Sequence, residues 1–440
     1  MSELANDYPL SDHFDASDAV SPDSGSDVFD MDSPFAPDLA NPPSRRELFR
    51  DAVAVGIAAA LAPSLLSGGS ASAQGVPPTA STPPLAPSPG SPRAWIESVG
   101  VYSGSVNLAT GNLWLSLPLC GWGGLGGLSF GIVFNSQTSR TSSLGGKWTH
   151  SYRSFISGTS PAVAVDDDGT ETLFALSGAT YTAPVGVYES LVLNGNGTWT
   201  RTLKGGTVMT YLSSGSLDKI TDRNGNITQL AYTSGLLTSV TDPVGRVLTL
   251  GYTSGLLTSV TDALGRVRTL SYDANNRVSS ISEPLLSGVT FSRGIAYVSS
   301  TNANVASLTD RRGKTWGYAY GSANSIFAST TDPLTKTWSL AYYVDSASLK
   351  FARWTDPLTR YTDTAFDALG RSTKSANPLS QITLFGWDTA NNRTSMTTPS
   401  GKVWGSTYDS RGNGLTSTNP LGKVTTTTYQ NDFPDRKSVV

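Results

Sequence analysis

The side chains best suited to chemistry in this sequence lie between Gly121 and His150. Residues 127–131 read GLSFG, the GxSxG spacing that holds a nucleophilic serine on a sharp turn in hydrolases. Such an enzyme also needs an acid and then a histidine after the serine, because the imidazole takes the serine proton and the carboxylate orients the imidazole. His150 follows Ser129, but no Asp or Glu lies between them. The spacing argues against a hydrolase, and nothing else supports another order of the three residues.

A second motif precedes this one. Gly121, Gly123 and Gly126 fit the GxGxxG spacing of dinucleotide-binding sites. Those sites need a helix to begin at the glycines, so that its N-terminus can hold the pyrophosphate. The residues that follow, LSFGIVF, have the pattern of a strand. We therefore interpret the segment as a glycine-rich turn and predict no cofactor.

Metal ligands are scarce. The chain has one cysteine, Cys120, and two histidines, His13 and His150, which are too few for a Cys/His zinc site. Three consecutive acids at residues 166–168 lack the EF-hand spacing and fit a solvated turn better than a calcium site. A single cysteine excludes an internal disulfide, and Cys120 fits a small buried residue. We predict no catalytic residue and no metal site, and therefore no enzyme.

An array of repeats surrounds these residues. Residues 233–242, TSGLLTSVTD, recur letter for letter at residues 253–262, and a duplication at this period is typical of repeat proteins. An anchor residue, mostly Asp, recurs along the chain, and an aromatic residue follows each anchor after ten residues. The anchors are Asp222, Asp242, Asp262, Asp310, Asp332, Asp356, Asn377, Thr398 and Asn419. The aromatics are Tyr232, Tyr252, Tyr272, Tyr320, Tyr342, Phe366, Trp387, Tyr408 and Tyr429. We expect Glu283 to fill the one gap, with an insertion before Tyr297.

Each unit has the pattern of a β-hairpin. Residues 242–245, DPVG, suit a type I turn, with Asp first, Pro next and Gly245 last; Gly265 has the same place in the following unit. Residues 246–252 then alternate like a half-buried strand, residues 253–255 turn the chain, and residues 256–261 return as a second strand. The ten-residue interval is constant because a slip of one residue would turn every side chain to the other face.

These residues resemble the Rhs, or YD-repeat, family. The Tyr-Asp pair and its aromatic variants stand at residues 272–273, 366–367, 387–388 and 408–409, with Arg277, Arg371 and Arg393 after three of them. The resemblance covers residues 217–429 with about ten units. It implies a ribbon of β-hairpins that coils into a hollow shell, which in that family often encloses a C-terminal toxin.

The region before the repeats resembles the domain that precedes them in the same family. Residues 105–118 resemble its "VNxxTG" entry, and residues 132–136 and 146–151 resemble later strands and its "GWxH" element. The resemblance implies an N-terminal β-sheet cap or plug. We expect this domain over residues 95–215 and the repeats over residues 216–434.

The first 94 residues predict a leader and a linker. Residues 1–43 carry ten acids and no Lys or Arg, a composition typical of disorder. We expect an acidic leader and signal over residues 1–73 and an extended Pro-rich linker over residues 74–94.

Within the leader, Arg45 and Arg46, a mild apolar run and the A-x-A site at Ala71 and Ala73 resemble a twin-arginine export signal. The alternative is a membrane anchor, which we disfavour because the run is short and rich in Ala and Gly. We therefore expect an exported protein, in the cell envelope or outside the cell, with no membrane span after cleavage.

Two questions about ligands remain at this point. After residue 73 the chain has 28 Lys and Arg against 22 acids, but no basic run or RNA-binding signature accompanies this excess, so we expect no nucleic-acid partner. The repeat aromatics either form the packing face of the ribbon or stack on carbohydrate, and we favour packing.

The C-terminal residues raise a different expectation. Self-cleaving family members carry catalytic acids after the repeats and an Asp-Pro-x-Gly-type element; residues 242–245 mimic that element only inside a repeat turn. Residues 435–440, DRKSVV, are also the translation of a common sequencing adapter. We expect them to be an artefact, the gene to continue, and an uncapped strand edge near residues 424–429 to self-associate.

Together these patterns predict an all-β protein with an N-terminal sheet domain and a coiled hairpin ribbon. We expect an exported, non-enzymatic scaffold, the shell or carrier part of a larger polymorphic toxin or cell-contact protein, with a toxin cargo as its partner. The alternative is a repeat module that binds envelope carbohydrate through the aromatics.

Overall fold

The computed structural model describes residues 79–80, 83, 97–124, 126–284, 290–321, 325–345, 348–430 and 433–439. All of them belong to one compact unit, Pro37–Val440. The acidic leader, the export signal with Arg45, Arg46, Ala71 and Ala73, and most of the Pro-rich linker lie outside the described residues and stay predictions.

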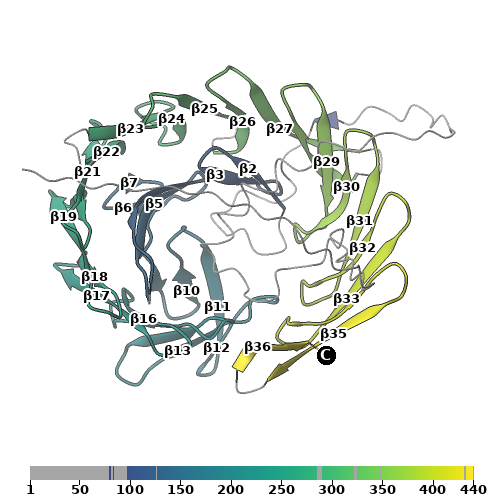
Figure 1. The fold of residues 1–440 in the computed structure, drawn as a ribbon, viewed down its shortest axis with the longest axis horizontal. Helices are drawn as coiled ribbons and strands as arrows, with labels where there is room; N and C mark the ends of the chain where they lie inside the picture. The colour runs from purple at the N-terminus through teal and green to yellow at the C-terminus, as the bar shows by residue number, and fades with distance from the viewer. Residues whose placement is uncertain are drawn as a thin grey trace, which may run out of the picture. The chain divides into compact units, whose positions relative to one another are not determined.

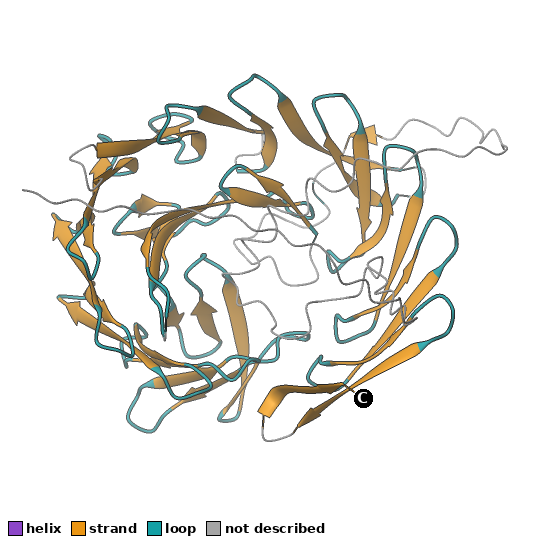
Figure 2. Cartoon of the chain, viewed as in Figure 1, coloured by secondary structure: helices purple, strands orange, loops and turns teal. Residues whose placement is uncertain are grey.

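The described residues form strands and no helix (Figure 2), which confirms the all-β fold. In chain order the strands are β1 (Thr79–Ala80), β2 (Ser98–Val101), β3 (Gly104–Asn107), β4 (Leu113–Gly121), β5 (Ser129–Asn135), β6 (Thr141–Ser142), β7 (Gly145–Gly146), β8 (Trp148–His150), β9 (Phe155–Ser157), β10 (Ala162–Val165), β11 (Glu171–Ser177), β12 (Thr180–Thr182), β13 (Ser190–Leu193), β14 (Trp199–Thr202), β15 (Val208–Tyr211), β16 (Leu217–Thr221), β17 (Ile227–Thr233), β18 (Leu236–Thr241), β19 (Val247–Thr253), β20 (Leu256–Thr261), β21 (Val267–Tyr272), β22 (Val278–Pro284), β23 (Thr290–Tyr297), β24 (Val305–Thr309), β25 (Thr315–Tyr320), β26 (Phe327–Thr331), β27 (Thr337–Val344), β28 (Lys350–Thr355), β29 (Tyr361–Phe366), β30 (Ser372–Ala376), β31 (Ile382–Trp387), β32 (Arg393–Thr397), β33 (Val403–Tyr408), β34 (Gly414–Thr418), β35 (Val424–Gln430) and β36 (Phe433–Val439).

Most strands belong to one ribbon of antiparallel hairpins. From β9 to β36 each strand pairs with the next one in sequence, and β1 pairs with the end of β27 (Figure 1). Such a ladder has short connections throughout, because antiparallel neighbours need only a turn between them. The ribbon begins before the predicted repeats, since β9–β15 already form part of it.

The duplicated segments show why these residues form hairpins. β18 and β20 have the same sequence and the same alternation of buried and half-buried residues. In β19, Leu248 and Leu250 are buried while Val247 and Thr249 are exposed. Ser254 and Gly255 both take positive φ, at 50° and 81°, in the two-residue loop that matches the twist of antiparallel strands.

The strand edge that we expected to be open is partly paired. β35 pairs with β36 from Thr427 opposite Val439 to Gln430 opposite Phe433. The prediction of a free edge near residues 424–429 is therefore wrong from residue 427 onward, because residues 433–439 supply the second strand of that hairpin.

A second, five-stranded sheet lies against the ribbon. Its order is β2-β3-β4-β5-β8, and Leu113, Leu115, Ile132 and Phe134 in it are fully buried. Its loops are held by side-chain amides; for example, Asn107 Oδ1 accepts hydrogen bonds from the backbone N–H groups that follow it. These bonds satisfy buried backbone donors that no strand reaches.

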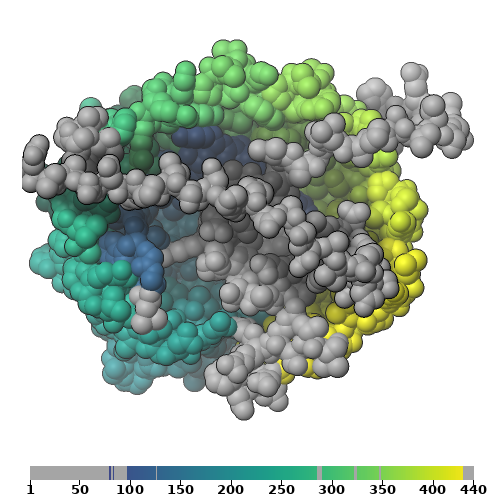
Figure 3. Space-filling view, viewed as in Figure 1, coloured from purple at the N-terminus to yellow at the C-terminus, as the bar shows by residue number. Residues whose placement is uncertain are grey.

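Specific contacts join this small sheet to the ribbon. Trp148 Nε1 donates to the Tyr297 hydroxyl at 2.8 Å, and the Tyr318 hydroxyl donates to the Tyr102 carbonyl at 2.7 Å. The Leu257 N–H donates to the carbonyl of Ser143, just after β6, at 2.9 Å. In the space-filling view the small sheet, blue, lies beside the teal and green hairpins of the ribbon (Figure 3). The two share one apolar core.

Candidate functional site

The repeat turns are closed by their anchor carboxylates. Oδ1 of Asp242 accepts hydrogen bonds from the backbone N–H groups of Val244 and Arg246 at 3.0 and 2.8 Å, and Oδ2 accepts one from Arg246 Nε at 2.6 Å. The turn at Asp262 has the same bonds. Gly245 takes φ = +84°, a conformation that favours glycine, and Gly265 takes +76°.

Burial and hydrogen bonding compete at these carboxylates. Burial alone would raise the pKa of Asp262, but hydrogen bonds from Arg268, Arg266 and the backbone outweigh it and lower the pKa to about 2. At Asp242 the same balance lowers the pKa, with Trp122 Nε1 as an additional donor at 3.0 Å. At Asp222 an amide replaces the guanidinium, since Asn226 Nδ2 donates to Oδ2 at 2.8 Å. These anchor carboxylates are therefore engaged by donors of their own turns and, at Asp242 and Asp262, also by Trp122 and Arg268.

Glu283 does not occupy a turn as we expected. It lies inside β22 opposite Phe291 and forms ion pairs with Arg293 at 2.5 Å and with Arg311. The gap in the anchor series is filled by a longer hairpin, β22–β23, whose strand pairing continues to Pro284 opposite Thr290.

The repeat aromatics join each unit to the one before it. At Tyr252 the strand register shifts, and the hydroxyl donates to the Leu237 carbonyl at 2.8 Å. Leu237 is in turn the residue that pairs with Tyr232. We name this series of contacts the aromatic ladder. Its members are Tyr232 to Leu217, Tyr252 to Leu237, Tyr272 to Leu257, Tyr297 to Val278, Tyr320 to Val305, Trp387 to Ser372 and Tyr408 to Arg393.

This geometry favours packing as the role of the aromatics. The rings of Tyr232, Tyr252 and Tyr272 are half-buried and pack against the core. Burial raises the pKa of Tyr252 to about 12, so its hydroxyl stays protonated and remains a donor. Each ladder contact gives a hydrogen bond to a carbonyl next to a bulge, where the regular strand pairing is interrupted.

Two consecutive repeat aromatics, Tyr342 and Phe366, are missing from the aromatic ladder, and Phe366 has no hydroxyl to donate. Tyr342 pairs with Ala352 in an unbroken register, and its buried hydroxyl has no hydrogen-bond partner among the described residues. In this region Arg353 of β28 joins its strand to β29. It forms two hydrogen bonds of 2.7 Å with Asp363, and its guanidinium lies 3.8 Å from the centre of the Tyr361 ring.

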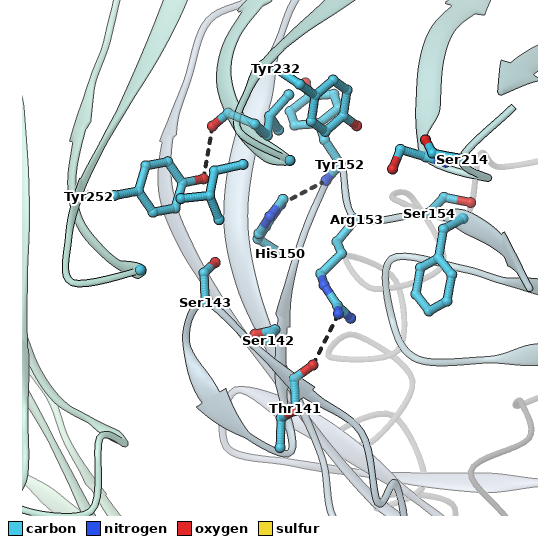
Figure 4. A pocket seen from close by; sticks show the side chains of 16 residues that line it. Thr141, Ser142, Ser143, His150, Tyr152, Arg153, Ser154, Ser214, Tyr232 and Tyr252 are labelled. Carbon is cyan, nitrogen blue, oxygen red and sulfur yellow. Dashed lines mark hydrogen bonds between the residues drawn. The ribbon is translucent and has the colours of Figure 1, made fainter. Parts of the chain in front are cut away.

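A pocket of about 510 Å³ opens between the ribbon and the small sheet (Figure 4). One side comes from the duplicated hairpins β17–β20, with Tyr232, Gly235, Tyr252 and Gly255. The other side comes from residues 141–155, and a short loop at residues 214–216 completes it. Equivalent positions of two consecutive units thus line one cavity.

The pocket carries one free positive charge. Arg153 is half-buried and donates to the Thr141 carbonyl at 3.0 Å. Burial and the neighbouring Arg140 charge lower the pKa of Arg153. His150 contributes no charge, because burial and then Arg153 lower its pKa to about 3.

The GxSxG and GxGxxG motifs lack the local structure that their chemistry requires. Ser129 begins β5, and no helix begins after Gly126, whose φ is +60°. His150 lines the pocket, but its Nδ1 accepts a hydrogen bond from the Tyr152 N–H. Cys120 is buried and unpaired by disulfide, and burial raises the pKa of its thiol to about 11.

Sequence reasoning missed a buried ion triad. Arg201 is fully buried and contacts Asp166 at 2.6 Å and Glu189 at 2.6 Å. Asp166 is therefore not a solvated turn residue, as we expected for residues 166–168, but a partner of Arg201. Glu189 and Arg201 belong to the β13–β14 hairpin, whereas Asp166 follows β10 and lies 35 residues before Arg201, so no local signal points to the triad.

No group of His, Cys, Asp or Glu within the described ranges is arranged to hold a metal ion. None of these segments forms a helix with the length and hydropathy needed to cross a bilayer.

The model of the RHS Repeat matches residues 252–285 and 366–403, and that of DUF6531, a domain of unknown function, matches residues 103–174. The search of curated proteins returned no match.

Several solved structures are similar in part. The crystal structure of TcdB2-TccC3-Cdc42 is 12% identical over 74% of this chain and 24% of that chain, with a TM-score of 0.33. The Photorhabdus luminescens Tc holotoxin pore is 11% identical over 74% of this chain and 24% of that chain, with a TM-score of 0.34. A porin-like protein from Bacteroides uniformis is 11% identical over 57% of this chain and 92% of that chain, with a TM-score of 0.16. The chain spans about a quarter of the length of the first two of these chains.

The paired strands, the anchor turns and the ladder define a β-hairpin repeat protein. The family models match the same repeat units and the region that precedes them. The chain contains RHS repeats, which the family model matches at residues 252–285 and 366–403.

Proposed function

We propose that this chain is a scaffold, the shell or carrier part of a larger polymorphic toxin or cell-contact protein, and that it has no catalytic activity of its own. The observation that carries the proposal is the aromatic ladder. In it the repeat tyrosines contact the preceding unit. Such contacts are expected of a repeat scaffold, because its stability is the sum of contributions from the units and from the interfaces between them.

A protection assay tests the scaffold role. A small folded reporter is fused after residue 440, and its half-life under protease is compared with that of the free reporter. A scaffold that encloses a cargo extends this half-life at least tenfold. A reporter joined through a long flexible linker is the control. Equal half-lives for the fused and the free reporter would contradict the proposal.

We also propose export to the cell envelope or beyond, because residues 44–73 resemble a twin-arginine signal. Replacing Arg45 and Arg46 with Lys should stop a reporter fusion from leaving the cytoplasm, because twin-arginine signals require the arginine pair. Export that continues unchanged would exclude this route.

The second candidate function is binding of envelope carbohydrate. The observation in its favour is that Tyr232 and Tyr252, two ladder aromatics, also line the pocket. A glycan array probed with the full chain separates the two functions, because a scaffold without a ligand site retains no glycan.

A further inference from the structure

We propose that the pocket between β17–β20 and residues 141–155 binds a small acidic carbohydrate, a hexuronate-sized ligand whose carboxylate pairs with Arg153. The inference gives the second candidate function a site and a ligand class. It is independent of the scaffold role, because the protection assay does not require a ligand.

The first step is the charge of Arg153. Several half-buried or buried guanidinium groups elsewhere in the described part of the chain have carboxylate partners, for example Arg201 with Asp166, Arg277 with Asp273, and Arg353 with Asp363. Arg153 forms no ion pair with any described residue, and the structure gives it one hydrogen bond, to a backbone carbonyl. A charge withdrawn from water without a partner is costly. An incoming carboxylate would supply that partner in the bidentate geometry that guanidinium favours.

Nothing nearby competes for this role. Arg140, the nearest cation, shares the Phe155 ring with Arg153, each guanidinium lying 5.2 Å from the ring centre. Arg140 is already neutralised by Glu171 at 2.7 Å. No Asp or Glu is among the residues that line the pocket, and His150 is neutral. The cavity therefore attracts an anion and selects against a cation.

The rest of the lining suits a sugar ring. Thr141 and Ser216 line the pocket with hydroxyl groups that have no hydrogen bond to another described residue. Tyr232 and Tyr252 also line the cavity, and their hydroxyls donate to backbone carbonyls (Figure 4). Aromatic surface beside a few polar groups is typical of small-molecule sites, and the C–H face of a sugar packs on such rings.

Size and access are also suitable. The volume of about 510 Å³ lies within the range of about 300–1,000 Å³ of ligand pockets. Thr141, Ser214, Gly235 and Gly255 are exposed at its margin, and the two glycines leave room beside the rings. A monosaccharide or disaccharide can therefore enter without a change in the strands.

The test is calorimetric titration of the full chain with D-glucuronate, with D-glucose and inorganic sulfate as comparison ligands. We expect saturable binding of glucuronate, at least tenfold tighter than binding of glucose or sulfate. Arg153→Gln should weaken glucuronate binding at least tenfold, because a charge-assisted bidentate contact is lost. Arg411→Gln removes an exposed guanidinium elsewhere and should leave binding unchanged.

Several outcomes would overturn the inference. These are no saturable binding of glucuronate, equal affinity for glucose, equal affinity for sulfate, or an Arg153→Gln variant that binds as the wild type does. Should Arg153→Gln fail to fold, Thr141→Val tests the same pocket without touching a charge. It should weaken binding about three- to tenfold through the loss of one hydrogen bond, and unchanged binding would count against the proposal.

Discussion

The hairpins β17–β22 and the hairpins β27–β29 use different contacts to join neighbouring repeat units. In β17–β22 each repeat tyrosine stands at a bulge and donates its hydroxyl to the preceding unit. In β27–β29 the register is unbroken, the Tyr342 hydroxyl has no described partner, and Arg353 holds Asp363 and Tyr361. The same ten-residue spacing thus permits two kinds of coupling between units, and the sequence interval alone does not determine which one forms.

The largest expected effect comes from deleting a ladder ring. Tyr252→Ala removes a half-buried ring and its hydrogen bond to Leu237, so we expect a loss of about 2–4 kcal/mol in the stability of the surrounding units. Hydrogen exchange of β18–β20 amides measures it locally. Thr249→Ala, at an exposed position of β19, is the control and should change stability by less than about 0.5 kcal/mol. A loss of only a few tenths for Tyr252→Ala would show that the ladder does not stabilise the ribbon.

Acid should weaken the anchor turns next. The folded pKa of Asp262 is about 2 against an ordinary value of 3.8, so its carboxylate stabilises the fold above about pH 4. This contribution, on the order of 2 kcal/mol, is lost as the pH falls from about 4 to about 2. Hydrogen exchange of β20–β21 amides against pH measures it. In Asp262→Asn the local stability should no longer fall between about pH 4 and pH 2. A fall equal to that of the wild type would show that other carboxylates cause the pH dependence.

The Arg353 cluster should be sensitive to the shape of its cation. Arg353→Lys keeps the charge but loses the paired hydrogen bonds to Asp363 and the planar contact with Tyr361, at a cost of about 1–2 kcal/mol in β27–β29. The matched variant Arg246→Lys, in a turn of the duplicated units, retains a charge near Asp242 and should cost less. Equal losses would erase the distinction between the two regions.

Removal of single hydroxyl groups should give the smallest and sharpest difference. Tyr252→Phe loses a hydrogen bond and should cost about 1 kcal/mol, whereas Tyr342→Phe removes a buried hydroxyl without a described partner and should be neutral or stabilising. Thermal denaturation of both variants is the measurement. A destabilised Tyr342→Phe would show that this hydroxyl is hydrogen-bonded in solution.

The hairpins were predictable because their signals are local. The interval from Asp242 to Tyr252 spans one turn and one strand, and both follow from Pro, Gly and alternation within ten residues. The ladder was not predictable, since a tyrosine reaches the preceding unit only where a bulge shifts the register. The pocket and the contact of Arg201 with Asp166 were missed because they join segments distant in sequence, which a single sequence does not reveal.

The duplication of residues 233–242 and 253–262 has a consequence for the folding pathway. A chain that omits residues 243–262 would join the first copy to residue 263 with every neighbouring letter preserved, so a misregistered intermediate could leave one unit looped out and still pair its strands correctly. Contacts with the region before the ribbon oppose this error, because Trp122, just after β4, bonds to Asp242, and Ser143, between β6 and β7, bonds to Leu257. Each contact reaches only one of the two copies, so the region before the ribbon distinguishes the first identical segment from the second.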